Sequence, residues 1–164
     1  MEALQAGSMA PEFTLSLIDG SIFSLAQARR RGPVLLAFFK VSCPVCQYSM
    51  PFLERIHQAY GGRKFTLVGI SQNSRRETEI FERQFAFTFP VALDAPQFAV
   101  SNAYGLTTVP TFFCIAPDGT IEISSAGWVK SEIAALNAKL AAGLKTAPAT
   151  IFLPGEQVAE WRPG

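Results

Sequence analysis

Two of the three cysteines of this chain are separated by two residues, in the motif Cys43-Pro44-Val45-Cys46. Thiols at this spacing can close a disulfide with each other or bind a metal ion. Three cysteines in 164 residues are too few for the disulfide framework that stabilises small secreted domains. The pair therefore indicates redox chemistry or metal binding rather than a structural cross-link.

The residues around the motif place Cys43 at the start of a helix. The apolar run at residues 34–39 is typical of a strand that is buried on both faces of a sheet. Beyond the motif, apolar residues recur at helical spacing until Gly61-Gly62, which is a helix-stop signal. Free N–H groups and the helix dipole at a helix N-terminus stabilise a thiolate, and Pro44 suits the first helical position.

This arrangement predicts thiol–disulfide exchange. We expect the Cys43 thiolate to attack a disulfide, and Cys46, on the first helical turn, to resolve the mixed disulfide that forms. Lys40, three residues before Cys43, is expected to add positive charge near the thiolate and so to tune the acidity of the thiol. Cys114 lies in an apolar segment, where we expect it to pack as a small hydrophobic residue.

Strand and helix patterns alternate along the rest of the chain. Hairpins are predicted around Asp19-Gly20 and around Pro117-Asp118-Gly119, because each turn separates two apolar-rich segments. Strands are predicted at residues 65–70 and 89–94, and helices at residues 96–104 and 131–142. A further helix is predicted after the capping pattern Ser74-x-x-Glu77, with Ile80, Phe81 and Phe85 facing inward. The basic run at residues 29–31 is expected in a solvated loop. The pattern as a whole predicts an α/β fold with parallel central strands and antiparallel edge hairpins.

The composition excludes several classes of protein. Apolar residues make up 49% of the chain and charged residues 16%, which excludes intrinsic disorder. A net charge of +1 offers no electrostatic footprint for nucleic acid, and no apolar run approaches the roughly 20 residues of a membrane-spanning helix. The N-terminus has no secretory signal pattern, so we expect a cytoplasmic protein; an exported chain trimmed of its signal would begin in the same way.

Several motifs together resemble the thioredoxin fold, in the redoxin branch that holds the TlpA-like thiol–disulfide oxidoreductases and the alkyl hydroperoxide reductase/TSA superfamily. The resemblance covers about residues 7–142, and its motifs occur in the family's order and spacing. The residues that carry it are Gly7, Ala10-Pro11, Phe13, Phe38-Phe39, the cysteine motif, Pro51, Thr108-Val109-Pro110-Thr111 and Gly127.

The resemblance implies a central mixed β-sheet flanked by helices, with an N-terminal β-hairpin extension. It implies that Pro110 is a cis-proline beside the cysteines and that the backbone of Val109 pairs with the substrate; we assign Pro44 and Val45 to the same substrate-binding surface. It implies no cofactor and no metal. The expected partners are a protein or small-molecule disulfide or thiol substrate and a dithiol electron donor, without nucleic acid or membrane, and the chain is expected to be a monomer or weak dimer.

The chain departs from the family pattern at three positions. Ser42 stands where many thioredoxins have a tryptophan, and Ala37 stands where thioredoxins have a buried acid. Ser49 stands where TlpA-like proteins have a glutamate on the active-site helix. The resemblance therefore leaves the proton acceptor of Cys46 unassigned.

Three alternative functions remain open from the sequence. A peroxiredoxin-like, antioxidant peroxidase would carry Thr or Ser at position 40 and an Arg near position 109, where this chain has Lys40 and Val109. A non-catalytic redox-sensing or adaptor module would use the exposed aromatic residues of the tail. A zinc site would need four ligands, and Cys114 and an exposed His57 are the only other candidates that we identify.

Two segments are predicted along the chain. Residues 1–145 are expected to form the redoxin domain. Residues 146–164 are rich in Pro and Gly and are expected to form an extended tail, whose Ile151, Phe152 and Trp161 cover an edge of the sheet.

Overall fold

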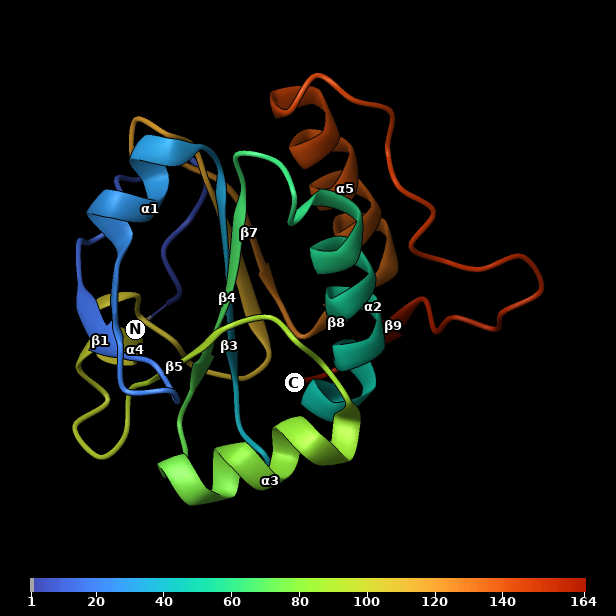
Figure 1. The fold of residues 1–164 in the computed structure, drawn as a ribbon. Helices are drawn as coiled ribbons and strands as arrows, with labels where there is room; N and C mark the ends of the chain where they lie inside the picture. Colours follow the sequence, from blue (N-terminus) through green and yellow to red (C-terminus); the bar gives the residue numbers. More distant parts are fainter. Residues whose placement is uncertain (1) are drawn as a thin grey trace.

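The apolar run before the cysteine motif forms the central strand of a five-stranded sheet in the computed structural model, which describes residues 2–164. This strand, β3 (Val34–Phe39), pairs in parallel with β4 (Thr66–Ser71) and antiparallel with β6 (Thr111–Ile115). The edge strands are β5 (Val91–Leu93), parallel to β4, and β7 (Ile121–Ala126), antiparallel to β6. The order β5-β4-β3-β6-β7 confirms the expected mixed sheet (Figure 1).

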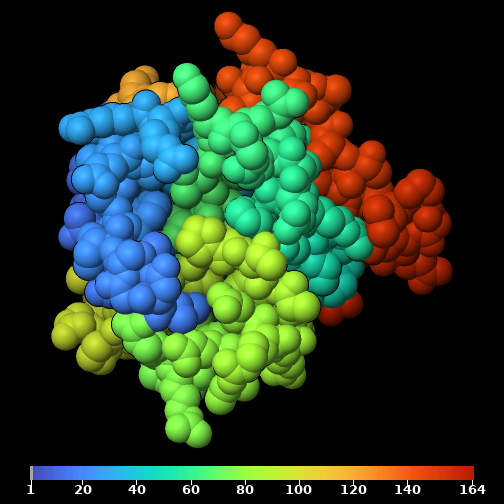
Figure 2. Space-filling model, viewed as in Figure 1, coloured from blue at the N-terminus to red at the C-terminus, as the bar shows by residue number. Residues whose placement is uncertain are grey.

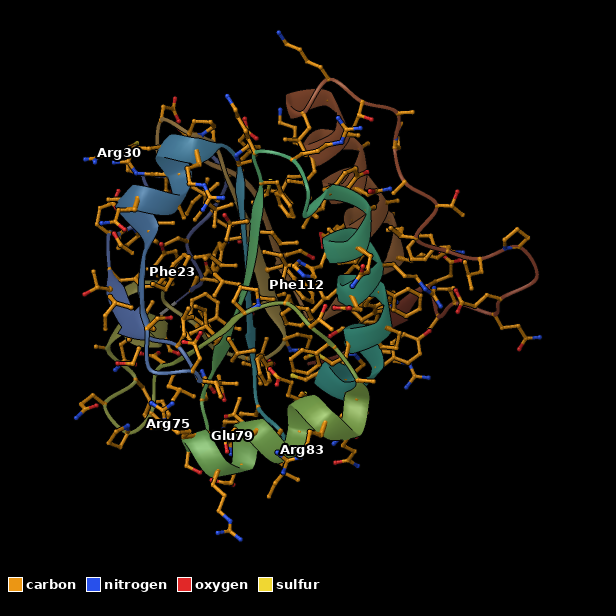
Figure 3. All side chains as sticks on the ribbon, in the orientation of Figure 1. Phe23, Arg30, Arg75, Glu79, Arg83 and Phe112 are labelled. Atoms are coloured by element: carbon orange, nitrogen blue, oxygen red, sulfur yellow. The ribbon has the colours of Figure 1, made fainter. Side chains whose placement is uncertain are left out.

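Helices cover both faces of this sheet because side chains alternate along β3. Leu35, Ala37 and Phe39 point into one hydrophobic cluster, and Leu36 and Phe38 point into the other. The first cluster contains residues of α2 (Pro44–Tyr60), α3 (Arg75–Phe85) and α5 (Lys130–Gly143). The second lies beneath α1 (Leu25–Arg31), α4 (Ala99–Ala103) and the predicted N-terminal hairpin, β1 (Thr14–Ser16) with β2 (Ile22–Ser24). Figure 3 shows Phe112 on the first side and Phe23 on the second.

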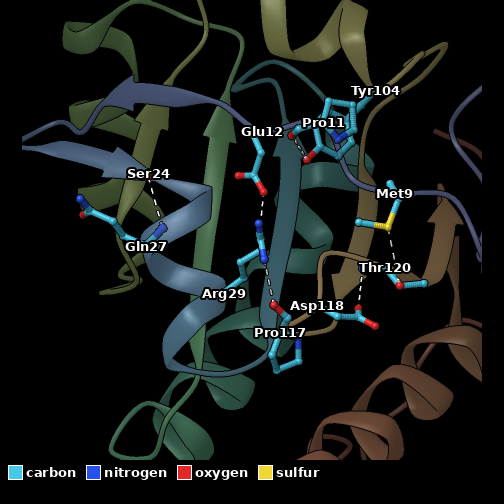
Figure 4. A network of polar contacts seen from close by, with 10 residues as sticks. All are labelled: Met9, Pro11, Glu12, Ser24, Gln27, Arg29, Tyr104, Pro117, Asp118 and Thr120. Carbon is cyan, nitrogen blue, oxygen red and sulfur yellow. Dashed lines mark hydrogen bonds and ion pairs between the residues drawn. The ribbon is translucent and has the colours of Figure 1, made fainter.

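The N-terminal arm and α1 are joined to the β6–β7 hairpin by polar contacts (Figure 4). The Arg29 guanidinium forms an ion pair with Glu12 at 2.6 Å and donates to the carbonyl oxygen of Pro117 at 3.1 Å. The expectation of a solvated loop at residues 29–31 is wrong, because these residues form the last turn of α1. The Ser24 hydroxyl caps the start of this helix by accepting from the Gln27 N–H. The three arginines lie in its last turn, where their positive charge interacts favourably with the helix dipole.

Two further expectations need correction. Ile80 was predicted to face inward, but 47% of it is exposed; its neighbour Phe81 stacks on Phe39 at 5.3 Å, and this turns Ile80 toward solvent. The helix predicted at residues 96–104 is shorter than expected, because only α4 (Ala99–Ala103) is helical. The buried Asp94 carboxylate accepts the N–H groups of Val100 and Ser101 and so fixes where that helix begins.

The tail at residues 146–164 runs beside α5 and α2, and Figures 1 and 2 show it forming the outer edge of that side. Ile151 is buried. The Phe152 ring lies 5.6 Å from that of Phe52, so both residues pack against helices rather than a sheet edge. Trp161 is 64% exposed. The tail ends by pairing β9 (Trp161–Arg162) antiparallel with β8 (Trp128–Val129).

Polar contacts hold the tail in place. The Tyr60 hydroxyl accepts from the Ala149 N–H at 2.8 Å and donates to the Asn137 side-chain oxygen at 2.6 Å. The Arg55 guanidinium forms a bidentate ion pair with the Glu156 carboxylate, with N–O distances of 2.7 and 2.8 Å. Across residues 2–164, none of the helices has the length and apolarity that crossing a bilayer requires.

If the tail is part of the folded core, replacing its buried residue must destabilise the protein. Ile151→Ala is expected to lower the free energy of unfolding by about 2–5 kcal/mol, because it leaves a cavity against the helices. Leu153→Ala, two residues away and 47% exposed, is expected to change that free energy by less than about 0.5 kcal/mol. Urea unfolding of both variants measures the difference. Equal effects of the two substitutions would show that the tail does not pack on the core.

Candidate active site

Cys43 lies where β3 has ended and α2 begins. It is the N-cap residue of α2, and Pro44 is the first helical residue, as the sequence predicted. The Cys43 sulfur accepts a hydrogen bond from the backbone N–H of Cys46 at 3.1 Å. One of the otherwise unpaired N–H groups of the helix therefore points at the sulfur, and the helix dipole favours negative charge there.

The loop before β6 brings a second part of the chain to the same sulfur. The Cys43 Sγ lies 3.5 Å from the carbonyl oxygen of Val109, and the peptide bond between Val109 and Pro110 is cis. The N–H of Gly127, where φ is +74°, donates to the Pro110 carbonyl at 2.8 Å and connects this loop to the end of β7. The predicted neighbours Cys43, Val109 and Pro110 are thus brought together.

The two cysteines of the motif differ in exposure. Cys43 is half-buried, whereas Cys46 is fully buried beneath it. Burial, followed by the hydrogen bond with Cys43, holds the pKa of the Cys46 thiol well above its ordinary value. An incoming disulfide can therefore reach Cys43 first, while Cys46 lies beneath it as a protonated thiol. Both cysteines are in the free thiol form.

Side chains that the sequence analysis missed hold the loop between β3 and Cys43. The Val41 N–H donates to the side-chain oxygen of Asn73 at 3.0 Å, and the Gln47 amide donates to the Val41 carbonyl at 2.9 Å. Asn73 follows β4, which is parallel to β3, so the ends of both strands meet at this edge of the sheet. That shared edge is the sequence signal that could have found Asn73.

The C-terminal tail also borders the site, which the sequence analysis did not predict. The hydroxyl of Tyr48, which lies on α2 five residues after Cys43, accepts from the Ala159 N–H at 2.9 Å. The Arg162 guanidinium lies 4.1 Å from the centre of the Tyr48 ring. A Cβ atom added to Gly164 would lie 2.6 Å from the carbonyl oxygen of Val109. The end of the described chain is therefore in contact with the loop that faces Cys43.

The remaining predicted positions contribute differently. The Lys40 side chain is exposed, and its carbonyl accepts from the Cys43 N–H at 3.3 Å. Ala37 and Ser49 are both buried, and the Ser49 hydroxyl donates to the Cys46 carbonyl at 2.7 Å. These two positions thus place no carboxylate beside Cys46. Pro44 is exposed and Val45 is half-buried.

The third cysteine and the single histidine lie in packed surroundings. Cys114 is buried within β6, where it is paired across the ladder with Leu35. Burial raises the pKa of Cys114 to about 12. His57, expected to be exposed, is half-buried with its ring 6.3 Å from that of Phe89. Within residues 2–164, no three His, Cys, Asp or Glu side chains are grouped so that they could hold a metal ion.

Known proteins with similar sequences include thiol-disulfide oxidoreductases. The model of the AhpC/TSA family matches residues 6–124. Thiol-disulfide oxidoreductase ResA of Geobacillus thermodenitrificans is 30% identical over 131 residues, which cover 79% of this chain and 74% of that protein.

Solved structures show the expected fold. A proposed protein disulfide isomerase from Bacteroides thetaiotaomicron aligns with a TM-score of 0.81 at 27% identity, over 88% of this chain and 95% of that one. The thioredoxin domain of a thiol-disulfide oxidoreductase from Bacteroides vulgatus aligns with a TM-score of 0.73 at 21% identity, over 84% and 98%. The predicted thioredoxin-like architecture is therefore confirmed.

The exposure of the three thiols predicts selective alkylation. With the reduced, folded protein near neutral pH, iodoacetamide is expected to modify Cys43 alone, because Cys46 is buried with a raised pKa and Cys114 is buried in the sheet. Mass spectrometry of peptides locates the adduct, and a denatured sample, in which all three must react, is the control. Modification of Cys46 at the rate of Cys43 would contradict the structure.

The raised pKa of Cys114 predicts a loss of stability in alkali. Its thiol titrates near 9.0 in the unfolded chain and near 12 in the folded one, so the unfolded state releases the proton first. The resulting stabilisation is complete below pH 9 and is lost as the pH rises toward 12. From pH 9 to 10, the reduced wild type should lose about 1 kcal/mol more unfolding free energy than Cys114→Ala. Parallel pH profiles of the two proteins would contradict this.

Proposed function

Because this chain belongs to the AhpC/TSA family, we propose that it is a thiol–disulfide oxidoreductase in which Cys43 is the nucleophile and Cys46 the resolving thiol. The observation that carries this proposal is the pairing of a reachable sulfur, held at a helix N-terminus, with a buried thiol on the first turn of the same helix. This arrangement suits two successive exchange steps that start at Cys43.

In the first step, the Cys43 thiolate attacks one sulfur of the substrate disulfide. A Cys43–substrate disulfide forms, the substrate S–S bond breaks, and the departing thiolate takes a proton from solvent. The Val109 carbonyl, 3.5 Å from the Cys43 sulfur, and the adjoining Pro110 border the space that the substrate must enter. With Pro44 and Val45 on the helix side, they form the proposed docking surface.

In the second step, Cys46 loses its proton and attacks the Cys43 sulfur. The second substrate thiol leaves, a Cys43–Cys46 disulfide remains, and two electrons have passed to the substrate. The Cys46 proton leaves to the departing substrate thiolate or to water, since neither Ala37 nor Ser49 carries a base. Another dithiol protein regenerates the pair by the same chemistry, and the reverse sequence of steps oxidises a substrate dithiol.

The peroxidase alternative lacks support at the thiol. Within residues 2–164, the partners of the Cys43 sulfur are the N–H and the thiol of Cys46 and the Val109 carbonyl. None of them is the hydroxyl or guanidinium donor that stabilises charge on peroxide oxygens in the transition state. An antioxidant role, a cytoplasmic location, the electron donor and a monomeric or weakly dimeric state stay predictions from the sequence.

Cysteine variants test the assignment of roles. Cys43→Ser is expected to abolish reduction of a model disulfide. Cys46→Ser is expected to accumulate a mixed disulfide on Cys43, because the resolving thiol is gone. Cys114→Ala, a matched control, is expected to retain wild-type turnover. Free-thiol trapping and mass spectrometry follow each species.

Two results would contradict the proposal. Substantial disulfide exchange by the Cys43→Ser variant would show that Cys43 is not the nucleophile. Consumption of hydrogen peroxide by the wild type, but not by Cys43→Ser, at a second-order rate far above that of a free thiol would favour the peroxidase function.

A further inference from the structure

A polar pocket opens at the loop that faces the Cys43 thiol. Its volume is about 220 Å³, and it is lined by Lys40, Gln72, Leu106, Thr107, Thr108 and Val109. Val109 belongs both to this pocket and to the contact with Cys43, because its carbonyl oxygen lies 3.5 Å from the sulfur. A ligand group held in the pocket would therefore be close to the reacting atom.

The charge of the pocket comes from Lys40 alone, since the lining contains no acidic residue. The Lys40 side chain is exposed, and it forms no ion pair within residues 2–164. The Thr107 hydroxyl likewise makes no hydrogen bond to that part of the chain and is free to donate. The Gln72 amide is held in place by its hydrogen bond to Ser101 at 3.0 Å. An ammonium group and a hydroxyl donor together suit a carboxylate.

A second cation lies on the tail segment whose end reaches the same loop. Arg162 lies over Tyr48 and, like Lys40, forms no ion pair with any of residues 2–164. The tail that carries it continues to Gly164, whose added Cβ would lie 2.5 Å from the Thr108 hydroxyl. Lys40 therefore lies in the lining of the pocket, and Arg162 lies two residues before the point where the tail meets the loop that faces Cys43.

We propose that this pocket binds a carboxylate that the disulfide substrate carries a few bonds from its sulfur atoms. The preferred substrates are then acidic disulfides, either glutathione disulfide or a peptide disulfide with Asp or Glu beside its cysteine. The inference rests on the proposed exchange function and names its substrate class. Lys40 acts as a specificity-determining residue, with Thr107 as the second donor.

The test compares probes of opposite charge on reduced protein. Glutathione disulfide and an acidic peptide disulfide are the anionic probes, and cystamine is the cationic one. Lys40→Glu is expected to lower the anionic-to-cationic rate ratio by about tenfold at low salt, since an exposed ion pair is worth up to about fivefold and reversal replaces attraction by repulsion. The change should shrink in 1 M salt.

A matched control has the same change of charge elsewhere. Lys64 lies just before β4, at the opposite end of the parallel β3–β4 pair from Cys43, so Lys64→Glu is expected to leave the ratio unchanged. If Lys40 acted only on the acidity of the thiol, Lys40→Glu would change all probes in the same direction and leave the ratio intact. The faster of the two anionic probes identifies the source of the carboxylate.

The outcomes separate the inference from the function beneath it. If every probe reacts at Cys43 but the ratio is the same in wild type and Lys40→Glu, the carboxylate site is wrong and the exchange function stands. If no probe reacts at Cys43, either by oxidising the Cys43–Cys46 pair or by forming a mixed disulfide in Cys46→Ser, the proposed function itself fails. An anionic-to-cationic rate ratio that falls in Lys40→Glu but not in Lys64→Glu supports the carboxylate site.

Discussion

The hydrogen bond from the Cys46 N–H to the Cys43 sulfur, at 3.1 Å, is the interaction on which the site depends. It exists because β3, buried on both faces, ends just before Cys43, and because α2 starts at the next residue. The strand fixes the position of the sulfur and the helix supplies the donor. The same helix turn buries Cys46 directly behind Cys43, so one local geometry positions both the proposed nucleophile and its proposed resolving partner.

The rest of the molecule holds this junction from three sides. Asn73, after β4, binds the loop before Cys43, and Val109, before β6, supplies the carbonyl that the sulfur faces. Tyr48 and the tail close the third side through the Ala159 N–H. Each contact joins residues far apart in the sequence, so the site is preorganised by the tertiary fold rather than by the motif alone.

The local features of the site could be predicted from the sequence because neighbouring residues determine them. Pro44 and the apolar spacing after Cys43 define the helix start, and the resemblance placed Val109 and Pro110. The contact of Asn73 is signalled only by its place after β4, the strand parallel to β3. The role of Tyr48 could not be predicted, since nothing local marks its partner in the tail. The helix at residues 25–31 was missed because its three arginines suggested a solvated loop, while its buried Leu25 and Ala28 make too short an apolar face to recognise. The packing of Ile151 likewise depends on distant helices.

The reduction potential of the Cys43–Cys46 pair is the most direct test of disulfide exchange at this site. Equilibration in dithiothreitol or glutathione buffers, followed by thiol trapping and mass spectrometry, measures the oxidised fraction. We expect one reversible two-electron transition, confined to Cys43 and Cys46, within the roughly −270 to −120 mV range of thioredoxin-fold exchange proteins. Failure to form a reversible disulfide, or a disulfide that includes Cys114, would contradict it.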